Sequence, residues 1–327
     1  FPQYLGALGA TLGMVGVVIS LRGVGNLISD LPGGLLLGRY RLRTILQVAL
    51  LVAGSASLVM AFVKSIVAIG VLVLLTGVMT SVVITAMMTY VRLRVPPDNR
   101  GRALSLVGGT VRVGGLVGPI AGGILADRLG FESAIVLRAI CYFLAFAAIV
   151  ADRRSAADPL PAGAVALATG RARGGRLRAT LVAQAKTVRA GIRGRERAIV
   201  LVGAGILMLH VLRASRTIVL PLWGDHLGLS ATLIGSVMSA GAALDLALFV
   251  PSGIIMDRAG RKVAGRLCIG LFAAGMLLLG FTAGIPGFFL ASLVMGFGNG
   301  FGAGINMTIG TDLAPDRAVS EFIGLWR

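Results

Sequence analysis

The sequence has little charge, few aromatic residues, and almost no cysteine or histidine. Charged residues make up 13% of its 327 residues and aromatic residues 6%, and there are two cysteines and two histidines. Soluble domains carry about 25% charged residues, so this chain has too few polar side chains to cover a surface that faces water. Cys141 and Cys268 give no indication of a disulfide framework. Two histidines are too few for a usual metal site, and we expect no metal and no cofactor.

The sequence also lacks the motifs of common enzymes. No Walker-type lysine pattern, His-Glu-x-x-His or Gly-x-Ser-x-Gly occurs. The glycine-rich stretch 296–306 does not have the Gly-x-Gly-x-x-Gly spacing of a dinucleotide loop. We therefore expect that the protein is not an enzyme. Two other classes stay open: the membrane subunit of an ATP-driven transporter, and a membrane scaffold or receptor.

Long apolar runs fill the sequence, which is 56% hydrophobic with a mean hydropathy of +0.91. A helix of about 20 apolar residues crosses the roughly 30 Å hydrocarbon layer of a membrane. Backbone groups in lipid must be hydrogen-bonded internally, so the runs predict an all-α membrane protein. The expected spans are 8–37, 43–63, 66–91, 103–125, 134–151, 198–221, 231–256, 264–283 and 286–310. A further span is expected to begin near Ser320.

The net charge of +18 is distributed unevenly between the two sets of loops. The loops 38–43, 92–102, 152–197, 257–266 and 311–319 together hold 23 Lys and Arg residues, whereas the opposite loops hold only Lys64 and Arg128. Basic loops stay on the cytoplasmic side of a membrane. We therefore expect a multi-pass protein of the plasma (inner) membrane with these loops in the cytoplasm.

Segment 152–197 is the one long polar stretch, and it divides the chain into helical bundles 1–151 and 198–327. Residues 176–197 are typical of a basic amphipathic helix on anionic lipid of the inner leaflet; a flexible linker that only enforces topology is an equal alternative. Aromatic and polar readout residues are missing among these basic residues, so no nucleic-acid partner is expected.

The second half of the chain repeats the first at a constant offset. "LGLSATLIGSVMSA" (227–240) aligns with "LGATLGMVGVVISL" (8–21), and at the same offset "PSGIIMDRAGRK" (251–262) aligns with "PGGLLLGRYRLR" (32–43). Both copies have the same orientation. Internal repeats in a helical membrane protein indicate a transporter whose halves rock against each other.

Three stretches carry a family resemblance. "GIIMDRAGRK" (253–262) fits the Gly-x-x-x-Asp-Arg-x-Gly-Arg-Arg/Lys signature of the major facilitator superfamily, and "GLLLGRYRLR" (34–43) resembles a degenerate copy. "GGLVGPIAGG" (114–123) resembles the fifth-helix signature of that superfamily's drug/proton antiporters. The resemblance covers the whole chain and implies two pseudo-symmetric bundles with twelve helices. This sequence then supplies the second to the tenth helix and the start of the eleventh, as an internal fragment that lacks the first and last helices.

The resemblance implies gating roles for the residues of these motifs. Asp257 is the exception among cations, and by pseudo-symmetry it is expected to face the helix that starts near Gly101–Arg102 as a state-dependent latch. Gly38 replaces the acid in the first copy, which predicts one working latch. Local pairing of Asp257 with Arg258 or Arg261 is the alternative. The gating residues are Gly34, Arg39, Gly253, Asp257, Arg258, Gly260, Arg261, Lys262, Gly114, Gly118, Pro119, Gly122 and Gly123.

Polar side chains inside the spans are candidates for the substrate and proton pathway, because a charge in mid-membrane is costly unless it faces a cavity or a partner. Asp245 is the candidate proton carrier; a static pair with an arginine is the alternative. Burial would raise its pKa, and a nearby Arg22 or Arg112 would lower it. For Asn299 and Asn306 two roles stay open: the side chains line the pathway, or they form a hydrogen bond between helices. The pathway candidates are Arg22, Asn26, Arg112, His210, Arg213, Asp245, Asn299 and Asn306.

These features predict a monomeric secondary transporter for a small-molecule substrate and protons. Proton-coupled efflux of small lipophilic or drug-like molecules is the leading hypothesis, because of residues 114–123. Transport of small organic anions or metabolites is the second, because the arginines outnumber Asp245. Val73 stands where many proton-coupled members carry an arginine on the fourth helix, and the first helix, with its key acid, lies outside this sequence.

Overall fold

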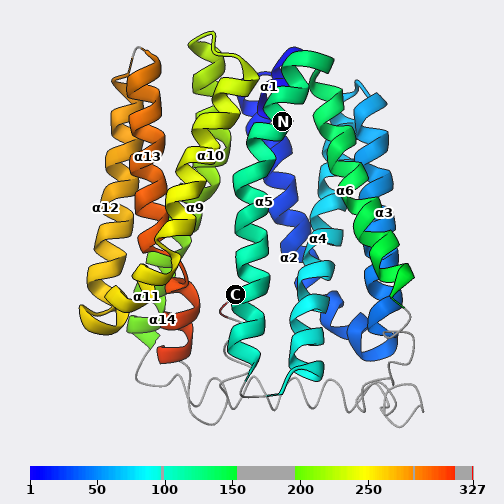
Figure 1. Ribbon diagram of the computed structural model, residues 1–327, viewed down its shortest axis with the longest axis vertical. Helices are drawn as coiled ribbons and strands as arrows, with labels where there is room; N and C mark the ends of the chain where they lie inside the picture. Colours follow the sequence, from blue (N-terminus) through cyan, green and yellow to red (C-terminus); the bar gives the residue numbers. More distant parts are fainter. Residues whose placement is uncertain (97–98, 153–195, 283, 314–325, 327) are drawn as a thin grey trace. The chain divides into compact units, whose positions relative to one another are not determined.

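The computed structural model describes residues 1–96, 99–152, 196–282, 284–313 and 326, and these residues form helices joined by short turns (Figure 1). No strand occurs within these ranges. The helices are α1 (Pro2–Ala7), α2 (Leu12–Arg39), α3 (Leu42–Phe62), α4 (Ile66–Arg94), α5 (Arg100–Leu129), α6 (Phe131–Ala151), α9 (Glu196–His226), α10 (Ala231–Ala247), α11 (Phe249–Arg258), α12 (Arg261–Gly280), α13 (Ile285–Phe301) and α14 (Ile305–Leu313).

All nine apolar runs are helical, and the prediction of an all-α membrane protein is confirmed. Within the described ranges, seven helices are long and apolar enough to cross a membrane, and the count is eight if the bent pair α10–α11 is taken as one span. The ninth run is divided, and its apolar part α13 has 17 residues. Most of the connector 152–197 and the expected span after Ser320 lie outside the described residues.

The expected span 231–256 is broken between α10 and α11, where the chain bends by 48°. Pro251 explains the position of the break. A proline inside a helix lacks the N–H for its hydrogen bond and its ring clashes with the carbonyl four residues earlier. That carbonyl belongs to Ala247, the last residue of α10.

The expected span 286–310 is broken between α13 and α14. The sequence there has a glycine at every second position from Gly296 to Gly304, and glycine costs about 0.5–1 kcal/mol relative to alanine inside a helix. Gly304 has φ of +77°, a conformation that favours glycine. The aligned part of α4 keeps only the first of these glycines, at Gly77, and the helix continues unbroken to Arg94.

The chain forms two compact units. The first contains Phe1–Arg171 together with Gly228–Ser236, and the second contains Ala172–Leu227 together with Val237–Arg327. In the first unit α2 packs against α4 and α3 packs against α6, and in the second α12 packs against α13. Residues 228–236 thus group with the N-terminal bundle, although the sequence places them in the C-terminal one.

The internal repeat is present in the coordinates as well as in the sequence. The starts of α2 and α10, of α3 and α12, and of α4 and α13 are each separated by the same offset as Pro32 and Pro251. The helix caps repeat too: Thr11 Oγ1 accepts a hydrogen bond from the Met14 amide, and Ser230 Oγ accepts one from the Leu233 amide. The two halves therefore place equivalent residues at equivalent turns of their helices.

A helix crossing also repeats. A Cβ added to Gly77 of α4 would meet the backbone of Arg22 on α2, and a Cβ added to Gly296 of α13 would meet the backbone of Gly241 on α10. Gly77 aligns with Gly296 in the repeat, and Arg22 aligns with Gly241. Glycine at such a crossing lets two helix backbones touch.

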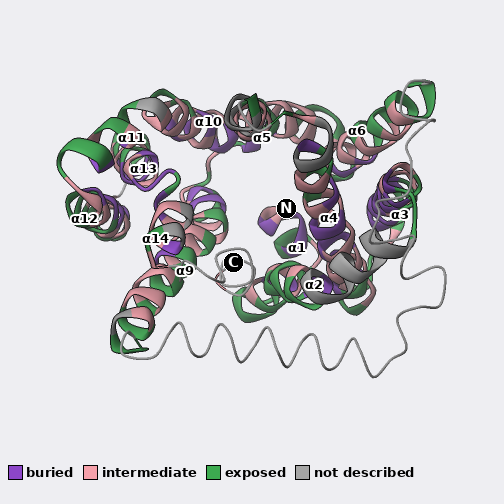
Figure 2. Cartoon of the chain, turned by 90° about the horizontal axis from the view of Figure 1, so that it is seen from below, coloured by how far each residue is buried: buried purple, intermediate pink, exposed green. Residues whose placement is uncertain are grey.

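Exposed residues occur along most of the helices (Figure 2), and many of them are large and apolar. Val67 on α4 is 78% exposed, Leu144 on α6 is 64% exposed and Phe281 after α12 is 86% exposed. Each would cost free energy in water, since burying such a side chain is worth about 1.5–3 kcal/mol. Hydrocarbon is the medium in which these surfaces are stable.

Candidate functional site

A polar cluster in the second unit surrounds Arg213 of α9. Its Nε donates a hydrogen bond to Asn299 Oδ1 at 2.8 Å, and its Nη2 donates one to the Gly302 carbonyl at 2.9 Å. Gly302 lies in the break between α13 and α14, and its carbonyl also accepts a hydrogen bond from the Ile305 amide at 3.2 Å. The carbonyl end of a helix attracts cations. The guanidinium therefore stabilises the broken helix, and the break in turn brings two uncharged oxygens to the arginine.

His210 lies one turn before Arg213 on α9 and faces the start of α14. Its Nε2 is 3.5 Å from the Asn306 side-chain nitrogen, a distance at the limit of a hydrogen bond. The Oδ1 atom of Asn306 is buried without a hydrogen-bond partner among the described residues. Four predicted pathway residues, namely His210, Arg213, Asn299 and Asn306, thus lie together along α9 and the α13–α14 break.

Asp245 of α10 belongs to the same unit, and Arg216 is close enough to interact with it electrostatically. The guanidinium of Arg216 lies against Gly241, in the space that a Cβ at this position would take. Asp245 follows Gly241 by one helical turn, on the same face of α10, and it interacts electrostatically with Arg216. An effect of Arg22 or Arg112 on Asp245 remains a prediction, and Arg216 is a further arginine that interacts with this acid.

Arg216 is not among the pathway residues predicted from the sequence. The alignment of the two repeats contains a feature from which Arg216 could have been predicted. Gly241 occupies the position that Arg22 has in the first half, so the second half lacks an arginine at its helix crossing. Arg216 supplies the missing guanidinium from the neighbouring helix, and each half therefore has an arginine at this crossing.

The pathway candidates of the first unit are Arg22 and Asn26 on α2 and Arg112 on α5. Arg22 and Asn26 stand one turn apart, and Gly77 brings the backbone of α4 against Arg22. The Oδ1 atom of Asn26 is buried with no hydrogen-bond partner in the described part of the chain. Such an acceptor favours a donor from a ligand or from water.

The antiporter-like stretch 114–123 lies in α5, and its last part touches α10 directly. A Cβ added to Gly123 would collide with the carbonyl of Ala231, and one added to Gly235 would collide with the carbonyl of Pro119. These four residues all belong to the first unit. The two helices therefore cross in backbone contact, which only glycine permits at these positions.

The earlier glycines of this stretch have more space. Cβ atoms added to Gly114 and Gly118 would meet no atom of the described structure within 4 Å, and one at Gly122 would reach Ala134 Cβ only at 3.8 Å. Close packing by this motif is thus limited to its last two turns.

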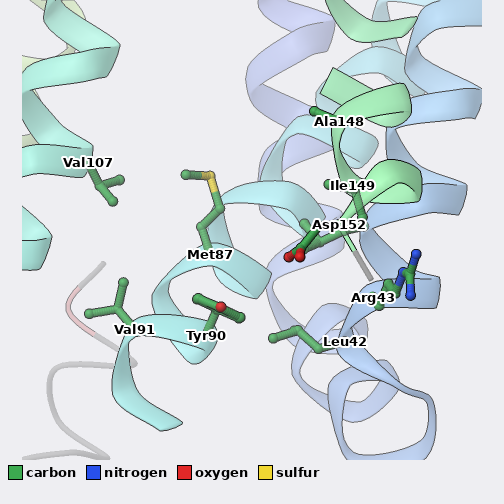
Figure 3. Close-up of a pocket in the computed structure, with 10 residues that line it drawn as sticks. Leu42, Arg43, Met87, Tyr90, Val91, Val107, Ala148, Ile149 and Asp152 are labelled. Carbon is green, nitrogen blue, oxygen red and sulfur yellow. The ribbon is translucent and has the colours of Figure 1, made fainter. Parts of the chain in front are cut away.

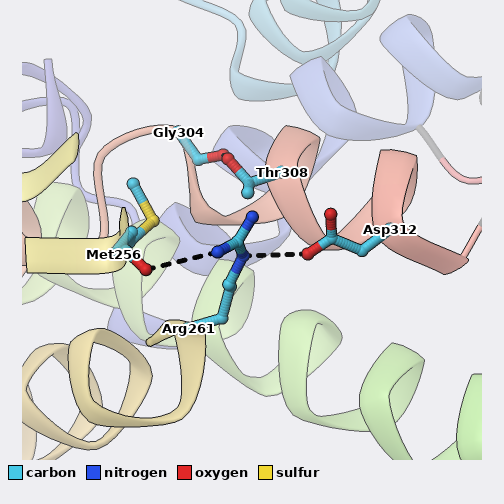
Figure 4. Close-up of polar contacts among 5 residues, drawn as sticks. All are labelled: Met256, Arg261, Gly304, Thr308 and Asp312. Carbon is cyan, nitrogen blue, oxygen red and sulfur yellow. Dashed lines mark hydrogen bonds and ion pairs between the residues drawn. The ribbon is translucent and has the colours of Figure 1, made fainter. Parts of the chain in front are cut away.

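The hairpin of residues 253–262 joins α11 to α12. Gly260 has φ of +89° between the two helices, so the glycine of the signature is required by the backbone. Arg261 binds Asp312 of α14 at 2.9 Å and also donates to the Met256 carbonyl (Figure 4). This basic residue of the signature thus fastens α12 to both α11 and α14 at the end that carries the basic loops.

Asp257 is exposed, and we find no ion pair for it in the described part of the chain. The surroundings of Gly34 and the side chains of Arg39 and Arg102 lie outside what the structure describes, as does the expected latch contact. The latch hypothesis for Asp257 remains a prediction, while Arg258 and Lys262 are exposed beside it.

The Arg261–Asp312 ion pair should contribute little to stability. The two side chains are 40% and 47% exposed, and exposed pairs contribute about 0–1 kcal/mol. Asp312→Asn should therefore lower the Tm in detergent by less than about 4 °C, measured by thermal unfolding beside Asp225→Asn as a matched control. A much larger loss would show that the pair is integral to the packing of α14.

A separate pocket of about 300 Å³ opens in the first unit between α3, α4, α5 and α6 (Figure 3). Its walls are apolar, and Arg43 and Asp152 lie at one end. Arg43 Nη2 donates to the Val150 carbonyl at 2.8 Å and so caps the end of α6. None of the predicted pathway residues lines this pocket, which excludes it as the meeting point of those residues. Its lining residues are Leu42, Arg43, Leu46, Met87, Tyr90, Val91, Val107, Ala148, Ile149 and Asp152.

Comparison with known families agrees with this architecture. The family model described as Major Facilitator Superfamily matches residues 1–327. The chain belongs to the Major Facilitator Superfamily. Its broken helices and its repeated crossings are therefore features of one member of that superfamily.

A curated relative of this superfamily member is the MFS-type transporter ppzB of Metarhizium rileyi (strain RCEF 4871). It is 30% identical over 129 residues, which is 39% of this chain and 27% of the relative. The match thus spans little more than a quarter of the relative's length.

Several solved structures share the fold. A variant of the peptide transporter POT in complex with sulfate is 16% identical, with a TM-score of 0.75, over 99% of this chain and 78% of that one. A D-xylose-proton symporter is 14% identical with a TM-score of 0.70, over 98% and 78%. A variant of the nucleoside transporter NupG is 13% identical with a TM-score of 0.73, over 98% and 79%. At these identities the likeness concerns the fold alone.

Proposed function

We propose that this member of the superfamily forms the core of a proton-coupled secondary transporter that exports small lipophilic or drug-like molecules. The observation that carries the proposal is the crossing of α5 with α10. The antiporter-like stretch ends in backbone contact with α10 at Gly123 and at Gly235. A transporter that moves its substrate against a gradient must seal one side of the membrane, and such a crossing excludes water between the helices.

Asp245 is the group that we assign to the proton. It is the acid nearest the middle of a span in the sequence, and it lies beside Arg216. Protonation of Asp245 would remove the counter-charge of that arginine. A charge inside a membrane protein favours a state in which it meets a partner or water, so the proton would bias the equilibrium between transporter states.

A second candidate function is the transport of small organic anions or metabolites. Arg213 donates hydrogen bonds to two uncharged oxygens, those of Asn299 and Gly302. With Arg216 and Asp245, the named residues of this cluster comprise two arginines and one acid, which is an excess of basic residues. Such an excess favours a carboxylate, phosphate or sulfonate group on the substrate over a cationic dye.

Transport driven by a pH gradient tests the proposal. In proteoliposomes with an acidic lumen, an antiporter should accumulate substrate as protons leave, whereas a symporter needs the opposite gradient. We expect accumulation of a lipophilic fluorescent drug with an acidic lumen, and its loss when an ionophore collapses the gradient. Accumulation of a small carboxylate in place of the drug would favour the second candidate. Lack of response to either gradient would contradict proton coupling.

A further inference from the structure

The last turn of α5 carries an acid whose partners lie 104 and 105 residues further along the chain. Asp127 Oδ1 accepts a hydrogen bond from the Ala231 amide at 2.9 Å, and Oδ2 accepts one from the Thr232 amide at 2.7 Å. The two oxygens of the carboxylate thus accept hydrogen bonds from two consecutive backbone N–H groups. Asp127 itself is exposed, so these bonds can be broken without opening an apolar core.

The two amides belong to the first turn of α10, where N–H groups have no partner within the helix. Ser230 Oγ accepts from the Leu233 amide at 3.2 Å and caps the helix locally. Asp127 satisfies the two donors that this cap leaves, and its negative charge faces the positive end of the helix dipole. In the first half the local cap is present at Thr11; the carboxylate of Asp127 is thus an addition to the local cap.

The contact continues the seam between α5 and α10. Gly123 stands one turn before Asp127 on α5 and meets the backbone of Ala231, and Gly235 meets Pro119 one turn deeper. The seam therefore runs over two turns of backbone contact and ends in the carboxylate. It lies at the end of α5 opposite to the basic loops, and α10 continues from it into the second unit at Val237.

We propose that Asp127 is a releasable clasp on α10. In this conformation it fastens the first turn of α10 to α5, and the transport cycle passes through a state in which both hydrogen bonds are broken. The physical basis is differential contact: an interaction made in one state only shifts the equilibrium towards that state. This inference concerns the seal between the helices and holds whatever the substrate or the coupling ion is.

Amide hydrogen exchange tests the contact itself. Removing a capping side chain shifts the equilibrium between the closed and the locally unfolded helix end by a factor of about 2 to 30. In the purified protein in lipid nanodiscs, Asp127→Ala should speed hydrogen exchange of the Ala231 and Thr232 amides by about that factor. Asp127→Asn keeps the shape of the side chain without its charge, so its exchange rates should lie between those of the wild type and of Asp127→Ala. Asp257→Asn, the same change at an exposed acid at the far end of α11, serves as the matched control and should leave this segment unchanged. Equal exchange in wild type and Asp127→Ala would overturn the contact.

A distance measurement tests whether the clasp is releasable. Spin labels at Lys64→Cys in the first unit and Phe281→Cys in the second, with Cys141 and Cys268 replaced by serine, report on the distance between the ends of α3 and α12. Asp127→Ala should enlarge the population with long distances in double electron–electron resonance, and Asp127→Asn should do so less. If exchange rises in Asp127→Ala but the distance distribution stays as in wild type, Asp127 is a static helix cap and the proposal of a releasable clasp is wrong. Asp127→Asn keeps both tests available should the alanine variant fail to fold.

Discussion

Replacing Asp245 by asparagine should uncouple transport from the proton gradient. Asparagine keeps the shape of the side chain but cannot carry a proton at neutral pH. Accumulation of substrate in proteoliposomes with an acidic lumen should fall to the level seen without a gradient, while exchange of substrate down its own gradient continues. Asp225→Asn, the same change at an acid near the end of α9, is the control and should stay coupled.

The variant also separates a proton carrier from a structural pair. Asp245→Asn leaves Arg216 without its counter-charge, so a lower Tm is expected as well. Adding Arg216→Gln removes the unpaired cation and should restore much of the Tm. If Asp245 carries the proton, the double variant stays uncoupled. Normal coupling in either variant would mean that Asp245 serves only to hold α9 against α10.

Gly296→Ala should strongly destabilise the second unit. The added Cβ would lie 2.8 Å from the Gly241 Cα and closer still to the Gly241 carbonyl oxygen, so α10 and α13 must separate. Overpacking costs about 1–3 kcal/mol and occasionally more, and a backbone neighbour cannot rotate away as a side chain can. We expect the free energy of unfolding to fall by an amount near the upper end of this range, or the variant to fail to fold. Thermal unfolding in detergent measures the effect.

Gly270→Ala is the matched control for this change. Gly270 lies inside α12, and a Cβ there meets nothing within 4 Å. Alanine at such a helix position is neutral or stabilises by about 0.5–1 kcal/mol. If both variants unfolded at the same temperature, the close crossing of α10 and α13 would be contradicted.

Asp245→Asn and Gly296→Ala test two parts of the same helix crossing. The crossing at Gly241 and Gly296 leaves space into which the guanidinium of Arg216 extends, and Ser292 of α13 lies at the same point. Larger residues at the crossing would move Arg216 as well as the helices. A mild variant such as Gly241→Ala is therefore expected to impair coupling along with stability.

The sequence determined the class of the protein, its helices and its repeat. Run length and hydropathy suffice for a membrane helix, because lipid leaves the backbone no other way to satisfy its hydrogen bonds. The offset between the two copies followed from local matches such as Pro32 with Pro251, and the helix starts repeat with that same spacing. Gly260 was selected from the signature as a gating residue, and the structure adds that its φ is positive.

Only the tertiary structure decided which polar residues meet. Arg213 meets Asn299, Arg216 interacts with Asp245, and Asp127 holds the amides of Ala231 and Thr232. These pairs join residues far apart in the chain, and each depends on helix rotation and on the angles at which helices cross. Hydrophobic periodicity is weak in a helix that is apolar on every side, so the sequence leaves that rotation open, and packing around small residues fixes it.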